Sequence, residues 1–149
     1  MKNNKYYRVY AEINLDAIVK NVDNLMALTK ENTGALAVVK ADGYGHGDVA
    51  VAKAVAQKVT GYAVATLDEA VNLRENGVKK PILVLGYVDP YEFDILVSHE
   101  ITATVFDVET AQLLADAARM QKKRHTAISK LIPVCEESDW NRMRMVLPL

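Results

Sequence analysis

Two kinds of apolar pattern alternate along the chain. Short apolar runs rich in valine, isoleucine and alanine are typical of parallel strands that are buried on both faces. These runs predict strands at Arg8–Asn14, Ala35–Lys40, Tyr62–Ala65, Ile82–Leu85 and Thr102–Val105.

Segments with helical spacing lie between these runs. In the first segment one face carries the apolar residues Leu15, Ile18, Val22, Leu25 and Met26, and Asp16 is an acidic residue or cap in the first turn. The same spacing predicts further helices at Asp48–Lys58, Leu67–Asn76, Pro90–Ser98 and Val108–Met120. The letters "ENG" at Glu75–Gly77 indicate a helix C-terminus with a glycine beyond it.

The order of these segments predicts an α/β fold of about five βα units in a row, with a parallel sheet and right-handed crossovers. Two architectures are compatible with this order: a doubly wound open sheet, and part of an eight-stranded (β/α)8 barrel of the TIM type. A whole barrel typically needs about 250 residues. Since the chain has 149 residues, its length favours the open sheet or a piece of a barrel.

Composition narrows the class of protein. The net charge is −1 and the basic residues are scattered, so nothing favours nucleic acid or an anionic membrane as a partner. No apolar run approaches the roughly 20 residues that span a bilayer, and "MKNNKYYRVY" is followed by no apolar segment of a signal peptide. Cys135 is the single cysteine, which excludes a disulfide framework and argues against a metal site. We therefore expect a cytoplasmic protein.

The most distinctive stretch is "AVVKADGYGHGD", Ala37 to Asp48. Lys40 ends the second predicted strand, and the carboxyl end of a strand carries the ligand site in both architectures. A lysine amine at such a place can attack a carbonyl, as in imine formation with pyridoxal phosphate. The alternative is that the chain simply reaches water at Lys40. Likewise Tyr44 alone predicts only a packing residue, and His46 alone a hydrogen-bonded structural histidine.

The combination "AVVKADGYGHG" closely resembles the cofactor-lysine segment of bacterial alanine racemases. The resemblance continues in "AEINLDAIVKNVDNL" before it and in "GYAVATLDEAVNLRENGVKKPILVLG" and "ITATVFD" after it. These stretches extend roughly from Tyr7 to Met120 in the order and spacing of the family. The resemblance implies pyridoxal 5'-phosphate as cofactor, interconversion of L- and D-alanine as the reaction, and an N-terminal eight-stranded barrel followed by a mostly β domain.

The resemblance also assigns roles to residues. Lys40 matches the lysine that carries the cofactor and acts as one of two racemisation bases. Tyr44 matches the tyrosine that contacts the cofactor phosphate, and Leu85 matches a residue that lines the cofactor ring. His46 matches a family position for which we favour a supporting role over proton transfer. The family's enzymes are homodimers, in which the second base is a tyrosine from the C-terminal domain of the partner subunit.

The end of the chain departs from the family. After Lys123 the letters "RHTAISKLIPVCEESDWNRMRMVLPL" have no clear strand or helix period. The family instead has a strand that ends in a "KVDTGMxRxG" motif. If each codon's third base is read with the next codon's first two, the residues from Ser129 to Asp139 can encode "KVDTGMRRIG". We therefore expect residues 1–123 to be the N-terminal part of the barrel and residues 124–149 to be a frameshifted tail.

Three hypotheses follow. The first is a truncated alanine racemase chain that has no measurable activity alone and self-associates through its open half-barrel. The second is a non-catalytic module that keeps a lysine reactive toward pyridoxal phosphate. The third is a relative of the single-barrel proteins of pyridoxal phosphate homeostasis, although "KADGYGHG" and the out-of-frame "KVDTGM" favour the racemase.

Overall fold

The computed structural model describes residues 9–129 and 144–146. Five parallel strands pair in the order of the chain, and a sixth strand pairs antiparallel with the fifth. The strands are β1 (Leu36–Val38), β2 (Gly61–Val64), β3 (Ile82–Val84), β4 (Thr102–Val105), β5 (Ala127–Ser129) and β6 (Arg144–Val146). The helices are α1 (Leu15–Met26), α2 (Lys40–Gly45), α3 (Asp48–Ala54), α4 (Leu67–Glu75), η1 (Pro90–Glu92), α5 (Phe93–Ser98) and α6 (Val108–Met120).

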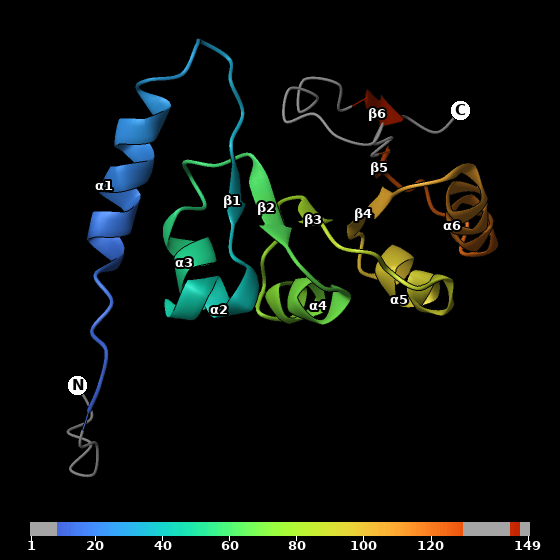
Figure 1. Ribbon diagram of the computed structural model, residues 1–149, viewed down its shortest axis with the longest axis horizontal. Coiled ribbons are helices and arrows are strands. Elements are labelled where there is room, and N and C mark those ends of the chain that lie inside the picture. Colours follow the sequence, from blue (N-terminus) through green and yellow to red (C-terminus); the bar gives the residue numbers. More distant parts are fainter. Residues whose placement is uncertain (1–8, 130–143, 147–149) are drawn as a thin grey trace.

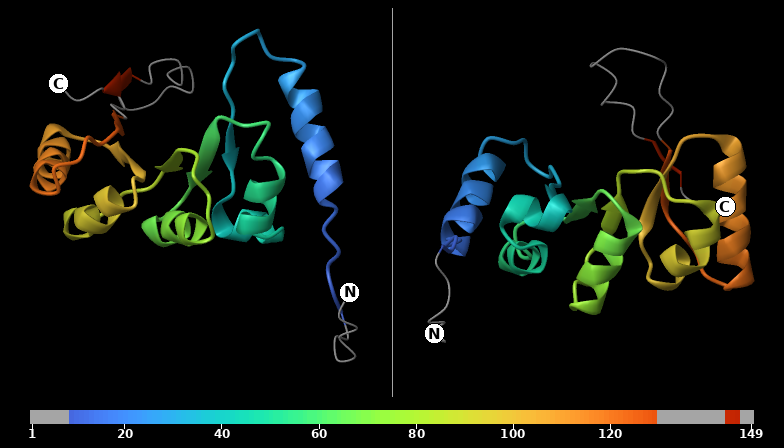
Figure 2. Two further views of the ribbon diagram at one scale, coloured as in Figure 1. Left: turned by 180° about the vertical axis from the view of Figure 1, so that it is seen from behind. Right: turned by 60° about the horizontal axis from the view of Figure 1, so that its bottom comes forward.

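The strand order decides between the two architectures. A doubly wound sheet reverses its strand order at a switch point and carries helices on both faces. Here the parallel order β1-β2-β3-β4-β5 has no reversal, and the helices that connect these strands lie along one side of the sheet (Figures 1 and 2). This is the winding of a (β/α)8 barrel, so the prediction of a partial barrel is confirmed.

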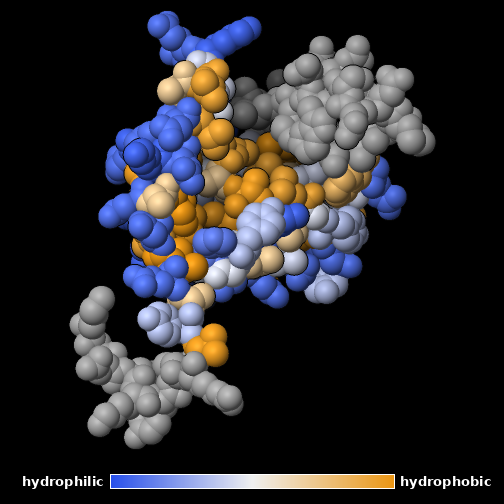
Figure 3. Space-filling view, turned by 60° about the vertical axis from the view of Figure 1, so that its left-hand side comes forward, coloured by the Kyte–Doolittle hydropathy of each residue, from blue (hydrophilic) through white to orange (hydrophobic). Residues whose placement is uncertain are grey.

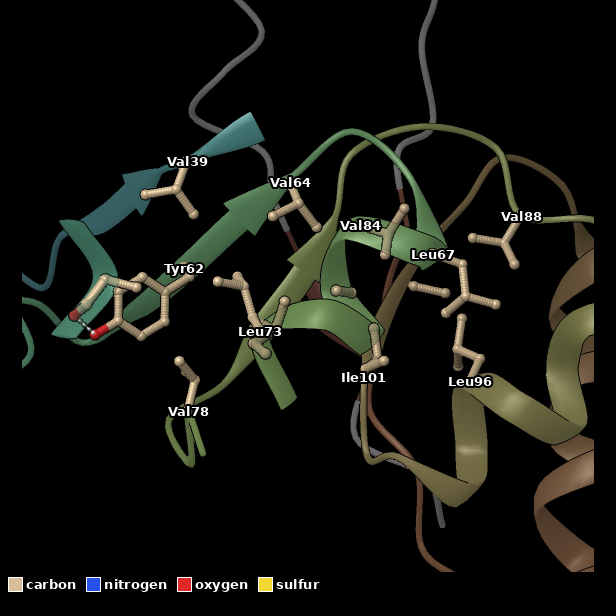
Figure 4. Close-up of a cluster of buried hydrophobic side chains, with 14 of the residues drawn as sticks. Val39, Tyr62, Val64, Leu67, Leu73, Val78, Val84, Val88, Leu96 and Ile101 are labelled. Atoms are coloured by element: carbon tan, nitrogen blue, oxygen red, sulfur yellow. Dashed lines mark hydrogen bonds between the residues drawn. The ribbon is translucent and has the colours of Figure 1, made fainter. Parts of the chain in front are cut away.

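One face of the sheet packs on the helices. Val39, Tyr62, Val64, Ile82 and Val84 belong to the main hydrophobic core (Figure 4 shows part of it). The Tyr62 hydroxyl lies in this core and donates a 2.6 Å hydrogen bond to the carbonyl oxygen of Ala52 in α3. The alternate residues of the same strands therefore point to the opposite face.

The opposite face is exposed at the β1 end of the sheet. Leu36 and Val38 are 46% and 43% exposed, whereas Leu83 in the middle of the sheet is 4% exposed. Viewed from the side of α1, the molecule shows apolar side chains gathered between polar ones (Figure 3). β1 thus ends the sheet with an apolar edge.

One predicted strand is absent from the described residues, and one observed parallel strand was not predicted. Residues 9–14 form no strand, because no described strand lies beside them to accept their backbone hydrogen bonds; Val9 and Tyr10 are 82% and 77% exposed. Arg8 lies outside the described residues. Conversely, no strand was expected after Lys123, but β5 pairs in register with β4 at Ala103↔Ala127. The fifth parallel strand is therefore β5.

The helix predictions agree better with the structure. α6 has the predicted bounds, and α4 ends one residue before the Asn76 cap, with Gly77 in the left-handed region at φ 89°. The predicted helix Asp48–Lys58 ends earlier, at Ala54. The predicted helix Pro90–Ser98 is divided into the 3-10 helix η1 and α5, and Pro90 stands in the first turn of η1, a position that proline favours.

Candidate functional site

Two of the predicted site residues lie at the same edge of the sheet. Lys40 follows β1 and Leu85 follows β3, and the carboxyl ends of parallel strands meet at one edge. β2 separates β1 from β3. Since adjacent strands lie about 4.8 Å apart, these two strands lie roughly 10 Å apart. The space above β2 at this edge is therefore bordered by both residues.

The backbone after Lys40 makes an unusual turn. Ala41, Asp42, Gly43 and Tyr44 all have left-handed values of φ, at 52°, 53°, 60° and 56°. Only glycine adopts this conformation without strain, and for other L-residues it costs roughly 1–2 kcal/mol each. The sequence here is rich in glycine, at positions 43, 45 and 47. It did not predict a continuous left-handed turn that includes residues other than glycine.

Hydrogen bonds hold the far end of this turn. The ring Nδ1 of His46 lies 3.1 Å from the carbonyl oxygens of both Gly43 and Tyr44, so Nδ1 carries the hydrogen and donates it. The backbone N–H of Asp48 donates to the Asp42 carboxylate at 3.1 Å. His46 thus makes structural contacts within the turn, in line with the supporting role that we expected for it.

Glu69 holds the near end of the turn, and sequence reasoning missed this residue. One oxygen of its carboxylate, Oε1, accepts a 2.7 Å hydrogen bond from the backbone N–H of Ala41. The other oxygen, Oε2, accepts from the backbone N–H groups of Ala65 at 2.7 Å and Thr66 at 3.3 Å. The signal available was the capping box "TLDE", in which Thr66 caps α4 and Glu69 is the third helical residue. That motif predicts the contact with Thr66 but not the contact with Ala41.

The side chains at this edge differ in exposure. Lys40 is half-buried, and its amine makes no hydrogen bond or ion pair with any described residue. Tyr44 is 59% exposed, so its hydroxyl is available to a ligand rather than to the core. Leu85 is half-buried beside Gly86, at which a Cβ atom would lie 2.5 Å from the carbonyl oxygen of Ala65. Glycine is therefore required for the ends of β2 and β3 to approach each other.

Other classes of site are not seen in the described part of the chain. Among residues 9–129 and 144–146, no group of three or more histidine, cysteine, aspartate or glutamate side chains could hold a metal ion. Within the same residues no helix is long and apolar enough to cross a membrane.

Comparison with known proteins gives one consistent result. The sequence model described as "Alanine racemase, N-terminal domain" matches residues 13–131. Alanine racemase 1 of Bacillus subtilis is 45% identical over 125 residues, which are 83% of this chain and 31% of that protein. Alanine racemase 1 of Oceanobacillus iheyensis is 40% identical over 83% of this chain and 33% of that protein.

Solved structures agree. An alanine racemase of Clostridium difficile superposes with a TM-score of 0.79 at 39% identity and covers 82% of this chain and 32% of that one. A histidine racemase from Leuconostoc mesenteroides superposes with a TM-score of 0.69 at 27% identity, over 76% of this chain and 30% of that one. The chain spans about a third of the length of these relatives. On its sequence and on its fold, the chain belongs to the alanine racemase family and corresponds to part of the N-terminal barrel domain.

Proposed function

We propose that this chain is the cofactor-anchoring part of a pyridoxal phosphate-dependent racemase that interconverts L- and D-alanine. The observation that carries the proposal is the place of Lys40. Its amine follows β1 at the edge where barrels of this type bind ligands, within a segment that resembles the family's cofactor-lysine segment.

The residues at this edge fit the cofactor. Lys40 offers a primary amine with no partner among the described residues, which can hold an aldehyde covalently. The exposed Tyr44 hydroxyl can donate to a phosphate, and Leu85 can pack against an aromatic ring. When bound, pyridoxal phosphate supplies an electron sink for the charge that develops when the α-proton leaves.

Lys40 has a second role in this proposal. Racemisation removes the α-proton on one face of the substrate and returns a proton on the other, so two groups must act. Lys40 Nζ serves one face. By resemblance, the group on the other face is a tyrosine of another domain in the partner of a homodimer. Since the chain spans about a third of its relatives, we expect no measurable alanine racemase activity from it alone.

A second amino-acid substrate has support from one observation. The histidine racemase that superposes on this chain has the same fold at 27% identity. Lys40 and Tyr44 would serve the cofactor and not the substrate side chain. The choice between alanine and another amino acid therefore depends on residues other than the ones assigned above.

We also propose that the reading frame changes near β5. The family match ends at residue 131 and β5 ends at Ser129, where the out-of-frame "KVDTGMRRIG" begins. Both ends support a break a few residues later than the Lys123 border expected from the sequence. A nucleotide sequence whose codons from Ser129 onward do not give this motif would refute it.

Titration with pyridoxal phosphate tests the proposed function. We expect saturable binding, followed by its absorbance, that is lost in Lys40→Ala and retained in Lys53→Ala, since Lys53 is an exposed lysine of α3. Equal binding by both variants would show that Lys40 is not the anchor. Alanine turnover by the wild-type chain, prepared from a host without racemases, would contradict the expected inactivity.

A further inference from the structure

Glu69 joins two neighbouring strand ends at the candidate site. Its Oε1 atom accepts from the N–H of Ala41, the residue after Lys40, and its Oε2 atom accepts from the N–H of Ala65, the residue after β2. Both hydrogen bonds are 2.7 Å long, as is typical of charge-assisted bonds to a carboxylate. The end of β1 is thus tied to the end of β2 by a single side chain.

Helix capping alone does not account for this arrangement. In a capping box the third helical residue needs one oxygen to accept from the backbone of the cap residue. Glu69 meets that need with Oε2, which lies 3.3 Å from the Thr66 nitrogen. Oε1 is not needed for the cap, and it accepts a hydrogen bond from Ala41, which lies 28 positions earlier in the chain.

The Ala41 amide is the point where the turn needs support. Ala41 is the first of five consecutive residues with positive φ, which end at Gly45. His46 and Asp48 hold the other end of the turn, whereas Glu69 is the side chain seen to hold its start in the described residues. A strained segment persists only when its surroundings fix it.

We propose that Glu69 is a positioning residue for Lys40. By fixing the amide that follows Lys40 against the end of β2, its carboxylate sets the direction in which the lysine side chain leaves the backbone. The role of the amine itself rests on the proposed function. The tie between Glu69 and the turn rests on the hydrogen bonds alone.

The test compares Glu69→Gln with two controls in the full chain. Ala41 and Ala65 donate to different oxygens of the Glu69 carboxylate. Glutamine replaces one of these oxygens by an NH2 group, so it cannot accept from both amides in this geometry. Thr66→Ala removes the cap hydroxyl of α4 but leaves the carboxylate in place. Asp107→Ala removes the side-chain cap of α6, which accepts from Thr110 N–H at 2.6 Å, far from Lys40 along the sheet.

Two readouts separate positioning from stability. The first is hydrogen exchange of the Ala41 amide, which we expect to speed up on the order of tenfold in Glu69→Gln and to stay near the wild-type rate in both controls. The second is the rate at which pyridoxal phosphate, fixed by borohydride, modifies Lys40 relative to Lys53 in the same sample. We expect this ratio to fall on the order of tenfold in Glu69→Gln and to change less than about twofold in the controls.

The outcomes are distinct. Unchanged exchange at Ala41 in Glu69→Gln, or faster exchange with an unchanged Lys40 rate, overturns the positioning role. An equal loss in Thr66→Ala also overturns it, because capping would then explain the effect. If wild-type Lys40 is modified no faster than Lys53, the proposed function fails, and exchange at Ala41 still decides whether Glu69 holds the turn.

Discussion

At the scale of the residue, single polar side chains connect backbone segments that are distant in sequence, because each side chain forms hydrogen bonds with more than one of them. Glu69 does so at the carboxyl edge of the sheet. Arg74 does so at the other end of α4, where its guanidinium donates to the carbonyl oxygens of Val78, Lys80, His99 and Glu100 at 2.7–2.9 Å. Burial lowers the pKa of Arg74, which is consistent with a partly desolvated cation surrounded by carbonyl groups.

Replacement of Arg74 should therefore destabilise the fold. In Arg74→Met several carbonyl oxygens lose their donor, and we expect the free energy of unfolding in urea to fall by about 2–3 kcal/mol. The matched control is Arg119→Met, because Arg119 forms an exposed ion pair with Asp116 at 2.8 Å. Loss of this ion pair should lower the free energy of unfolding by less than about 0.5 kcal/mol. Equal effects of the two substitutions would contradict the role given to Arg74.

At the scale of the element, the pattern of apolar residues predicted the parts that are buried and missed the parts that depend on neighbours. β2, β3, β4 and α6 lie where their apolar runs predicted, because burial determines both the pattern and the structure. Residues 9–14 have a strand-like sequence but no described neighbour to pair with. β5 was missed because polar residues flank and interrupt its short apolar run in "HTAISK".

The candidate site was predicted only in part. Lys40 was singled out because a charged residue ends an apolar run, and the resemblance then pointed to Tyr44 and Leu85; the roles of these three residues stay predictions. The left-handed turn was not predictable, since Ala41 and Tyr44 do not favour positive φ by themselves. The hydrogen bond from Ala41 to Glu69 was not predictable either, because it joins residues 28 positions apart.

The left-handed turn predicts that alanine-to-glycine substitutions change the free energy of unfolding in opposite directions inside and outside the turn. Ala41 has φ 52°, so Ala41→Gly should relieve strain and raise the free energy of unfolding by up to about 1 kcal/mol. Ala50 lies exposed inside α3, so Ala50→Gly should lower it by about 1 kcal/mol. Urea unfolding of both variants measures this, and destabilisation by both would argue against a left-handed Ala41.

At the scale of the whole molecule, the sheet has the winding of a barrel and an edge at β1. The outer side of β1 has no described strand beside it, and Leu36 and Val38 expose apolar surface next to that edge. Free strand edges with apolar neighbours promote pairing between chains. Self-association is therefore expected from the sheet itself, separately from the homodimer of the whole enzymes in the family.

Sedimentation tests this expectation. The chain should associate with rising concentration, and Val38→Lys should shift it toward monomer, because a lysine at the edge opposes pairing. Ile95→Lys is the matched control: Ile95 is 48% exposed in α5, remote from β1 in the order of the sheet. A monodisperse wild-type monomer, or an equal effect of both lysines, would contradict a role for the β1 edge.

The central claim is that Lys40 is the residue that anchors pyridoxal phosphate. Reduction of the chain with borohydride in the presence of a small excess of the cofactor, followed by peptide mass mapping, tests it most directly. The account predicts one main modified peptide, which contains Lys40, at a cofactor concentration that leaves exposed lysines such as Lys53 and Lys79 unmodified. Modification spread evenly over the exposed lysines would contradict it.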